Sequence, residues 1–307
     1  MESKTPAKVI LFGEHAVVYG KPAIAVAINI YSSVIVEKHS SMLIDGIQPD
    51  KKYHSYILKA YELSGVDFPV SIRIRSSFSQ SSGLGSSASI TVGTVSSLLY
   101  LIEKWSKDNI ARIAFETEYQ VQGRASPIDT STVTLGGAVM ISPKKSERSL
   151  WKIEKNGYLW WIERLEISEL DLIVANSGIR SSTAQMVSKV NNFVSKNKFG
   201  MEIIDEIGKI TEDAIAPLKN GDLEKIGNLM NRNNKLLNII GVGHESTTKI
   251  IENVIDYSYG AKITGAGGGG AVVIIPRKKE MVIEKLESMG IKYYEVKIDN
   301  EGVSFIK

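Results

Sequence analysis

The sequence predicts an α+β protein built in two halves. Strand-like and helical patterns are mixed along the whole chain, without the strict alternation that a parallel α/β sheet requires. The order of these patterns changes after about residue 165, where a strand leads into a series of helices. We therefore expect one domain over residues 1–165 and a second over residues 166–307. Each half also contains one glycine-rich segment, at residues 83–89 and 265–270.

The first half begins with strand patterns. Apolar or alternating segments predict strands over residues 8–12, 23–30, 33–36 and 70–75. Helical patterns follow over residues 90–101 and 108–121. Residues 132–141 have the pattern of a strand pair broken at Gly136 and Gly137, and residues 143–163, which include three tryptophans, have no regular pattern.

The second half is richer in helical patterns. Strands are expected over residues 170–175, 261–264 and 271–276, with two short ones at the end of the chain. Helices are expected over residues 182–195, 200–218, 223–239, 246–257 and 280–289.

The composition is that of a globular protein and excludes several functional classes. The 307 residues are 43% hydrophobic and 23% charged, and the net charge of +3 comes without a dominant basic block. This balance argues against nucleic acid as the main partner. No apolar run reaches the roughly 18 residues of a membrane span, and the N-terminus has no signal-peptide pattern. We expect a soluble cytoplasmic protein with no membrane partner, and a homodimer is compatible with the sequence.

Metal and redox chemistry is restricted by the residue types present. The chain has no cysteine, which excludes disulfides, thiolate zinc sites and cysteine nucleophiles. Its histidines are too far apart in the sequence to suggest a metal cluster, at His15, His39, His54 and His244. Any metal is therefore expected to have oxygen ligands.

The segment Gly83 to Ser89 is typical of a phosphate-binding loop. Two glycines and adjacent serines stand immediately before a helical run of small residues, and a helix N-terminus offers free N–H groups and positive potential to an anion. The lysine of a Walker A loop is missing. The G-x-G-x-x-A dinucleotide pattern is present, but a serine-rich stretch separates it from the preceding strand, and the nearest downstream acid, Glu103, lies within or at the end of the predicted helix. A plain Gly/Ser linker is the alternative.

The second glycine segment, residues 265–270, contains five glycines among six residues between two predicted strands. A tight turn would account for some of them. Because every further glycine costs chain entropy, the excess indicates that another backbone or a ligand passes very close.

If ATP binds the first loop, phosphoryl transfer needs metal ligands, a cation and a group that orients the acceptor. Glu118, on a predicted helix, is a candidate magnesium ligand together with Ser87 or Ser86. Asp129, on the turn after that helix, is a candidate proton acceptor, and Lys8 on the first strand can stabilise the transferred charge. Each has an ordinary alternative. Glu118 could lie on a solvated helix face, Asp129 could be a turn or cap residue, and Lys8 could be an exposed lysine near the N-terminus. The pair Glu14-His15, after Phe12-Gly13, is either a substrate-orienting element or a turn.

Several segments resemble the motifs of the GHMP kinase family, and of its mevalonate kinase branch in particular. The first motif is carried by Pro6 to Gly20, which includes Phe12-Gly13-Glu14-His15, the second by Gly83 to Ser89 and the third by Lys262 to Gly270. Residues 176–183 and 241–244 are similar to segments between the second and third motifs. The matches occur in the family's order and span both halves.

The resemblance implies a fold, a reaction and a set of site residues. It implies an N-terminal half like ribosomal protein S5 domain 2, a ferredoxin-like C-terminal half and an active site between them. The implied reaction is the ATP- and Mg²⁺-dependent phosphorylation of the 5-hydroxyl of mevalonate, in the mevalonate pathway of isoprenoid biosynthesis. Lys8 and Asp129 match catalytic residues, and Ser87 and Glu118 match magnesium ligands. The ATP-binding positions are Gly83, Leu84, Gly85, Ser86, Ser87 and Ala88; those of the mevalonate pocket are Glu14, His15, Thr183 and Gly267.

Two alternatives stay open. Another small-molecule GHMP kinase, acting on phosphomevalonate, homoserine or a sugar, would share the motifs. A phosphorylated substrate should call for additional Arg or Lys near Glu14-His15, and the charge of Glu14 should repel it. A non-catalytic nucleotide-binding regulator would keep the fold, although Lys8, Glu118 and Asp129 argue against it.

Overall fold

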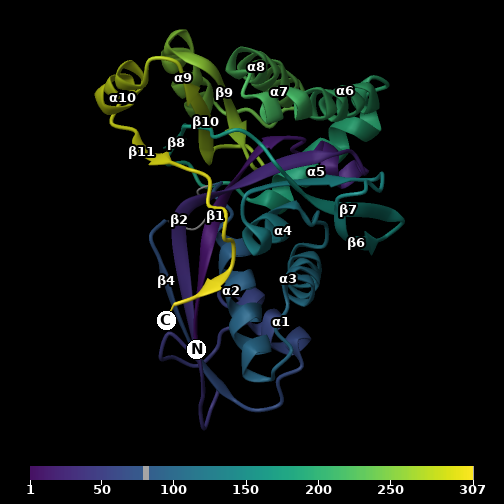
Figure 1. The fold of residues 1–307 in the computed structure, drawn as a ribbon, viewed down its shortest axis with the longest axis vertical. Helices are drawn as coiled ribbons and strands as arrows, with labels where there is room; N and C mark the ends of the chain where they lie inside the picture. The colour runs from purple at the N-terminus through teal and green to yellow at the C-terminus, as the bar shows by residue number, and fades with distance from the viewer. Residues whose placement is uncertain (79–82, 307) are drawn as a thin grey trace.

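Two sheets organise the fold (Figure 1); their strand pairs are antiparallel except for the short parallel pair β3–β4. The computed structural model describes residues 1–78 and 83–306, so the end of the predicted loop 76–82 lies outside the described residues. The first sheet has the order β12-β1-β2-β5-β7-β6, with β4 also beside β2 and β3 beside β4. Its strands are β1 (Glu2–Phe12), β2 (Ala23–Lys38), β3 (Leu43–Ile44), β4 (Val70–Ser76), β5 (Ala138–Ser142), β6 (Ser149–Lys155), β7 (Tyr158–Leu165) and β12 (Ser304–Phe305).

The second sheet has the order β11-β8-β10-β9. Its strands are β8 (Leu172–Asn176), β9 (Ser258–Thr264), β10 (Ala271–Pro276) and β11 (Lys292–Val296). In chain order these strands occupy positions 2, 4, 3 and 1 of the sheet, and helices connect β8 to β9 and β10 to β11. This is the β-α-β-β-α-β topology of a ferredoxin-like unit, as expected from the sequence resemblance.

The helices of the first half lie beside its sheet. They are α1 (Ser55–Ser64), α2 (Ser86–Leu101), α3 (Lys107–Gln122) and α4 (Ile128–Leu135), with a short 3₁₀ helix, η1 (Ala16–Tyr19). Helices α2 and α4 pack on β1 and β2, and α1 and α3 pack against α2. The second half contains α5 (Thr183–Lys196), α6 (Gly200–Asp213), α7 (Ile215–Asn220), α8 (Leu223–Ile239), α9 (Glu245–Val254), η2 (Ile255–Tyr257) and α10 (Lys279–Ser288).

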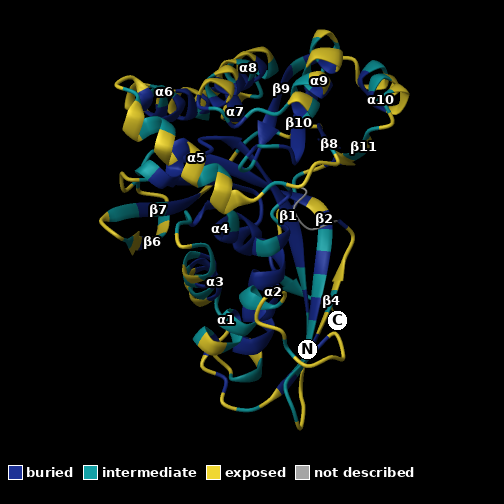
Figure 2. Ribbon diagram, turned by 180° about the vertical axis from the view of Figure 1, so that it is seen from behind, coloured by how far each residue is buried: buried dark blue, intermediate teal, exposed yellow. Residues whose placement is uncertain are grey.

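One hydrophobic core continues from the first half into the second. Side chains alternate along β8: Leu172 and Val174 face a core that also contains Val9 and Leu11 of β1, whereas Ile173 and Ala175 pack in a separate core with α9 and α10. Strands β1, β5, β8, β9 and β10 are accordingly buried over most of their length, and exposed residues lie on the outer faces of the helices and in loops (Figure 2). The two sheets are therefore fixed to each other by shared packing.

The chain also crosses between the halves at its C-terminal end. Strand β7 ends at Leu165 and β8 begins at Leu172, so the proposed boundary near residue 165 falls between the two sheets. Beyond β11 the chain returns to the first sheet, where β12 pairs with β1. Both termini consequently lie at the same end of the molecule (Figure 1). Within the described residues, no helix is long and apolar enough to span a membrane.

The strand pair expected over residues 132–141 is wrong in its first part, because residues 128–135 form helix α4. Its β-branched residues favour strands, but every residue of α4 except Asp129 is buried. The hydroxyls of Thr132 and Thr134 each donate to the carbonyl four residues earlier, at 2.7 Å. Tertiary packing and these internal bonds outweigh the local preference.

The expectation of irregular structure over residues 143–163 is also wrong. These residues contain strand β6 and most of β7, which form a hairpin. Its turn is Asn156-Gly157, where φ is 49° and 79°. Positive φ at both positions matches the type I′ turn that Asn-Gly favours, so the signal was present in the sequence.

Candidate functional site

A cleft of about 1140 Å³ lies between the two halves. From the first half it is lined by parts of β1, the N-terminal turn of α2, and α3 and α4. From the second half it is lined by residues 180–185 and by the glycine segment after β9. The two glycine-rich segments, which are far apart in the sequence, therefore face one cavity.

The N-terminus of α2 forms an anion-binding corner of this cleft. Gly85 caps the helix with φ of 75°, and a Cβ placed there would lie 2.6 Å from Cε of Lys8. The Lys8 amide donates to the carbonyl of Leu84 at 3.0 Å, which fixes the loop to β1. Ser86 Oγ is buried with no hydrogen-bond partner among the described residues. The free N–H groups of the first turn thus point into a polar, rigid corner suited to phosphate.

Lys8 and Asp129 form an ion pair in the cleft, with 2.9 Å between Nζ and Oδ2. Lys8 is 2% exposed, whereas Asp129 is 29% exposed. The sequence placed Asp129 on a turn, but it lies in the first turn of α4. The second carboxylate oxygen, Oδ1, is buried and has no partner among the described residues, and the exposed part of Asp129 lines the cleft.

Glu118, on α3, is buried in the same corner. Ser87 Oγ donates to its Oε1 at 3.5 Å. Burial, and after it the neighbouring Asp129 carboxylate, raise the pKa of Glu118 to about 8, against the opposing effects of Lys8 and Ser87. Two carboxylates and two serine hydroxyls therefore meet where more positive charge would be stabilising.

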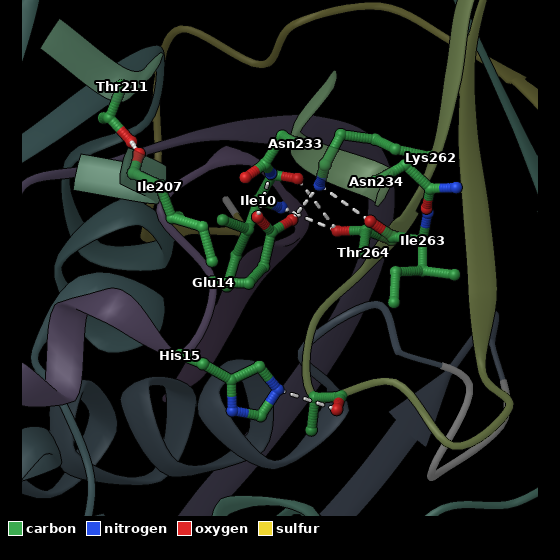
Figure 3. Close-up of polar contacts among 11 residues, drawn as sticks. Ile10, Glu14, His15, Ile207, Thr211, Asn233, Asn234, Lys262, Ile263 and Thr264 are labelled. Atoms are coloured by element: carbon green, nitrogen blue, oxygen red, sulfur yellow. Dashed lines mark hydrogen bonds and ion pairs between the residues drawn. The ribbon is translucent and has the colours of Figure 1, made fainter. Parts of the chain in front are cut away.

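The Glu14-His15 turn, between β1 and η1, is held by the second half of the chain (Figure 3). Glu14 pairs with Lys262 of β9 through one carboxylate oxygen, and Asn233 Nδ2 of α8 donates to the other at 3.1 Å. His15 Nε2 lies 2.9 Å from the carbonyl of Ala266, so this nitrogen carries a proton. Burial lowers the pKa of His15 to about 4, which keeps the imidazole neutral.

Other backbone segments approach the second glycine segment very closely, as its glycine excess predicted. Gly267 has φ of 75°, and a Cβ there would lie 2.3 Å from the carbonyl oxygen of Val242. The next amide, of Gly268, donates to that oxygen at 2.7 Å, and the amide of Gly270 donates to Ile179 at 2.9 Å. The segment is thus a packed wall of the cleft.

Most of the predicted site residues line the cleft together. They are Lys8, Glu14, His15, Gly83, Gly85, Ser86, Ser87, Glu118, Asp129, Thr183 and Gly267. The side chains of Leu84 and Ala88 instead pack in hydrophobic cores, so only their backbone can serve a nucleotide.

Sequence reasoning missed several polar groups at this site. It gives no role to Lys262 and Asn233, although a lysine flanked by apolar residues in a short strand is a signal of a buried charge. Cationic side chains that also line the cleft are Lys52, Arg124 and Arg180. Among the described residues, no three histidine or acidic side chains gather closely enough to hold a metal by themselves.

Comparison with known proteins places this cleft in a family. Residues 52–137 match the family model of the GHMP kinases N terminal domain, and residues 214–295 match that of the GHMP kinases C terminal domain. A mevalonate kinase of Methanothermobacter thermautotrophicus is 35% identical, over 87% of each chain. One of Pyrococcus abyssi is 32% identical, over 98% of this chain and 96% of its own.

Solved structures agree with the sequence relatives. The structure of L. major mevalonate kinase in complex with R-mevalonate is 25% identical to this chain, with a TM-score of 0.79, and the match covers 98% of this chain and 96% of that one. The chain therefore belongs to the GHMP kinases and, within them, to the mevalonate kinase family.

Proposed function

We propose that this protein transfers the γ-phosphoryl group of ATP to the 5-hydroxyl of (R)-mevalonate, giving 5-phosphomevalonate and ADP. The observation that carries the proposal is the meeting of Lys8, Asp129, Glu118 and the N-terminus of α2 in one cleft. Family membership and the names of the relatives support mevalonate as the substrate.

In this proposal, Asp129 and Lys8 act on the hydroxyl that receives the phosphoryl group. The Asp129 carboxylate accepts the hydrogen bond of the 5-hydroxyl and takes its proton as the O–P bond forms. Lys8, held against Asp129 Oδ2, stabilises the negative charge shared by the attacking oxygen and the transferred group. The departing electrons stay on the β-phosphate of ADP, which the α2 N-terminus binds.

The corner formed by Glu118 fits a magnesium ion. A carboxyl whose pKa is raised by burial and by a second carboxylate is stabilised in its charged form by a cation, and Ser86 Oγ lacks a partner among the described residues. Glu118 and Ser87 would hold the ion through oxygen atoms, as Mg²⁺ prefers. When bound, the ion neutralises charge on the β- and γ-phosphates during transfer.

The mevalonate pocket is proposed to include Glu14, His15, Thr183 and Gly267. The charge of Glu14 does not by itself discriminate against a phosphorylated substrate, because Lys262 neutralises it. Lys262 is fully buried and is not among the described residues that line the cleft, so it offers no binding site to a second phosphate. Because Lys52, Arg124 and Arg180 also line the cleft, the choice of mevalonate over phosphomevalonate rests on the relatives rather than on this pair.

A substrate panel read by ADP release tests the proposal. Purified protein with Mg²⁺ and ATP is given mevalonate, phosphomevalonate, homoserine or galactose at equal concentrations. We expect mevalonate to be used with the highest kcat/KM. Turnover of another alcohol by folded protein, without mevalonate-dependent ADP release, would remove the substrate assignment.

A further inference from the structure

A buried polar cluster joins the two halves at the edge of the cleft (Figure 3). Glu14 and Lys262 are 1% and 0% exposed and form an ion pair. Lys262 Nζ also donates to the carbonyl of Ile263 at 2.7 Å, and Asn233 donates to the free oxygen of Glu14. Glu14 lines the cleft, whereas the other two are absent from the described residues that line it. Lys262 and Asn233 therefore contact the cleft lining through Glu14, and burial, with a contribution from the charge of Lys262, lowers the pKa of His15.

The partners of Glu14 are themselves held in place. Asn233 lies on α8, next to Asn234, whose Oδ1 accepts the amide of Ile263 at 3.1 Å. Asn231, also on α8, accepts a hydrogen bond from the amide of Ala261 through its Oδ1, at 3.0 Å. Because β9 is an edge strand of its sheet, these side chains occupy the hydrogen-bonding positions that another strand would fill. Helix α8 is thus locked to β9, and Asn233 has a fixed position relative to Lys262.

The turn that these residues hold has a strained backbone. His15 has φ of 61° and ψ of −43°, a region that non-glycine residues seldom occupy. Such a conformation persists only where the surroundings determine it. The anchors are the bonds of Glu14 to Lys262 and Asn233, and the bond of His15 to Ala266 in the second glycine segment. All of them come from the second half of the chain.

We infer that Lys262 and Asn233 are positioning residues of the phosphotransfer site. Acting through Glu14, they hold the Glu14-His15 turn against residues 265–270 and so fix the geometry of the alcohol pocket. A buried ion pair contributes little net stability compared with apolar residues of the same size, but it does specify one arrangement. The inference rests on the proposed function, since it assigns Glu14 and His15 to that pocket.

A double-mutant cycle tests this inference. The variants are Lys262→Met, Glu14→Gln and the two combined, with kcat/KM for mevalonate, KM for ATP and Tm as readouts. We expect each single change to lower kcat/KM for mevalonate at least ~10-fold, with KM for ATP little changed. The kcat/KM of the double variant should be no lower than that of the more impaired single variant, because both substitutions remove the same Glu14–Lys262 ion pair. It should also regain most of the Tm lost by Lys262→Met, because no buried charge is left unpaired.

Two outcomes would overturn the inference. Wild-type kcat/KM in the double variant would mean that the pair serves folding alone. Wild-type kinetics in Lys262→Met, with a loss confined to Glu14→Gln, would mean that Glu14 acts on the substrate without help from Lys262.

The asparagines of α8 supply a matched control. Asn233→Ala removes the bond to Glu14, whereas Asn234→Ala removes only the bond to the β9 backbone. We expect both to lower Tm, and Asn233→Ala to lower kcat/KM for mevalonate several-fold more than Asn234→Ala, which loosens α8 but keeps the bond to Glu14. Equal kinetic effects would count against a role specific to Asn233.

Amide hydrogen exchange separates failure of this inference from failure of the proposed function. In the double variant we expect faster exchange in residues 13–20 and 265–270 than in the wild type, whatever the substrate proves to be. Unchanged exchange in both segments would overturn the positioning role, even if mevalonate is turned over. Absence of mevalonate turnover by the wild type, with faster exchange in the variant, would reject only the substrate.

Discussion

Lys8 Nζ lies 2.9 Å from Asp129 Oδ2, which joins the first strand of the chain to the first turn of a helix more than a hundred residues later. Lys8 is almost fully buried and lies over Gly85, at the N-terminus of α2. The ion pair therefore has a fixed position relative to the phosphate-binding corner, and the exposed part of Asp129 lines the cleft in which an acceptor hydroxyl would bind.

Asp129→Asn tests the role of this carboxylate. The amide keeps the size of the side chain but cannot take a proton from the hydroxyl, so kcat should fall at least ~10²-fold. Nucleotide affinity, measured by calorimetry, should change little, because Asp129 is not assigned to the phosphates. Asp67→Asn, at an exposed position, is the control that should keep wild-type kcat. A kcat of Asp129→Asn within a few-fold of the wild type would contradict the assignment.

Glu118→Gln tests the magnesium corner. Because the pKa of Glu118 is raised to about 8, the stability that this group contributes is present below its ordinary pKa of 4.5 and is lost as the pH rises toward 8. Without metal, the variant should therefore gain stability relative to the wild type as the pH rises from 5 to 8, as measured by urea unfolding.

The same variant should need more Mg²⁺ for half-maximal activity. Without metal, Glu118→Gln should be more stable than the wild type near pH 8. Adding Mg²⁺ and nucleotide should make the wild type the more stable protein, because its Glu118 carboxylate would then bind the cation. Identical Mg²⁺ dependence in the two proteins would exclude Glu118 as a ligand.

His15→Gln tests the neutral imidazole. Burial holds the pKa of His15 at about 4, against an ordinary value of 6.5, so the folded state excludes a proton that the unfolded chain binds. The stability from this group is present above pH 6.5 and is lost as the pH falls toward 4, by roughly 3 kcal/mol at 1.36 kcal/mol per pKa unit. The free energy of unfolding of the variant should fall less steeply over this interval. Parallel curves would show that folding does not lower the pKa of His15.

Gly85→Ala tests the contact between the phosphate loop and Lys8. An alanine there must adopt φ of 75° and place its Cβ 2.6 Å from Lys8 Cε. Displacement of Lys8 should lower kcat and raise KM for ATP. Gly65→Ala is a matched control, because Gly65 has φ of 70° but a Cβ added there would have nothing within 4 Å. Gly65→Ala should lose only about 1–2 kcal/mol of stability, the cost of holding an alanine at positive φ, and should keep the wild-type kcat and KM.

The sequence predicted much of the framework and the convergence of the main polar residues. Strand β4 alternates and helix α8 is amphipathic, whereas β1 and α2 were recognisable as apolar runs, and the glycine segments indicated close approach. The prediction failed at α4, where packing outweighs the strand preference of threonine and valine, and at the β6–β7 hairpin, where Asn156-Gly157 was overlooked.

The groups behind the site were harder to foresee. Asn233 has an ordinary surface interpretation when read singly, and the apolar neighbours of Lys262 indicate a buried lysine without indicating its partner. Their role depends on Glu14, which belongs to the other half of the chain and meets them only in the folded protein. Pairing across that distance leaves no local pattern in a single sequence.

The position of the transferred phosphate is the most direct test of the central claim. The protein is incubated with Mg²⁺, ATP and (R)-mevalonate until turnover is complete, and the product is examined by ³¹P NMR with proton coupling. The account predicts one new phosphomonoester signal, coupled to the two protons on C5, in equal amount to ADP. Inorganic phosphate without a new ester, or an ester on the C3 oxygen with no C5 coupling, would contradict it.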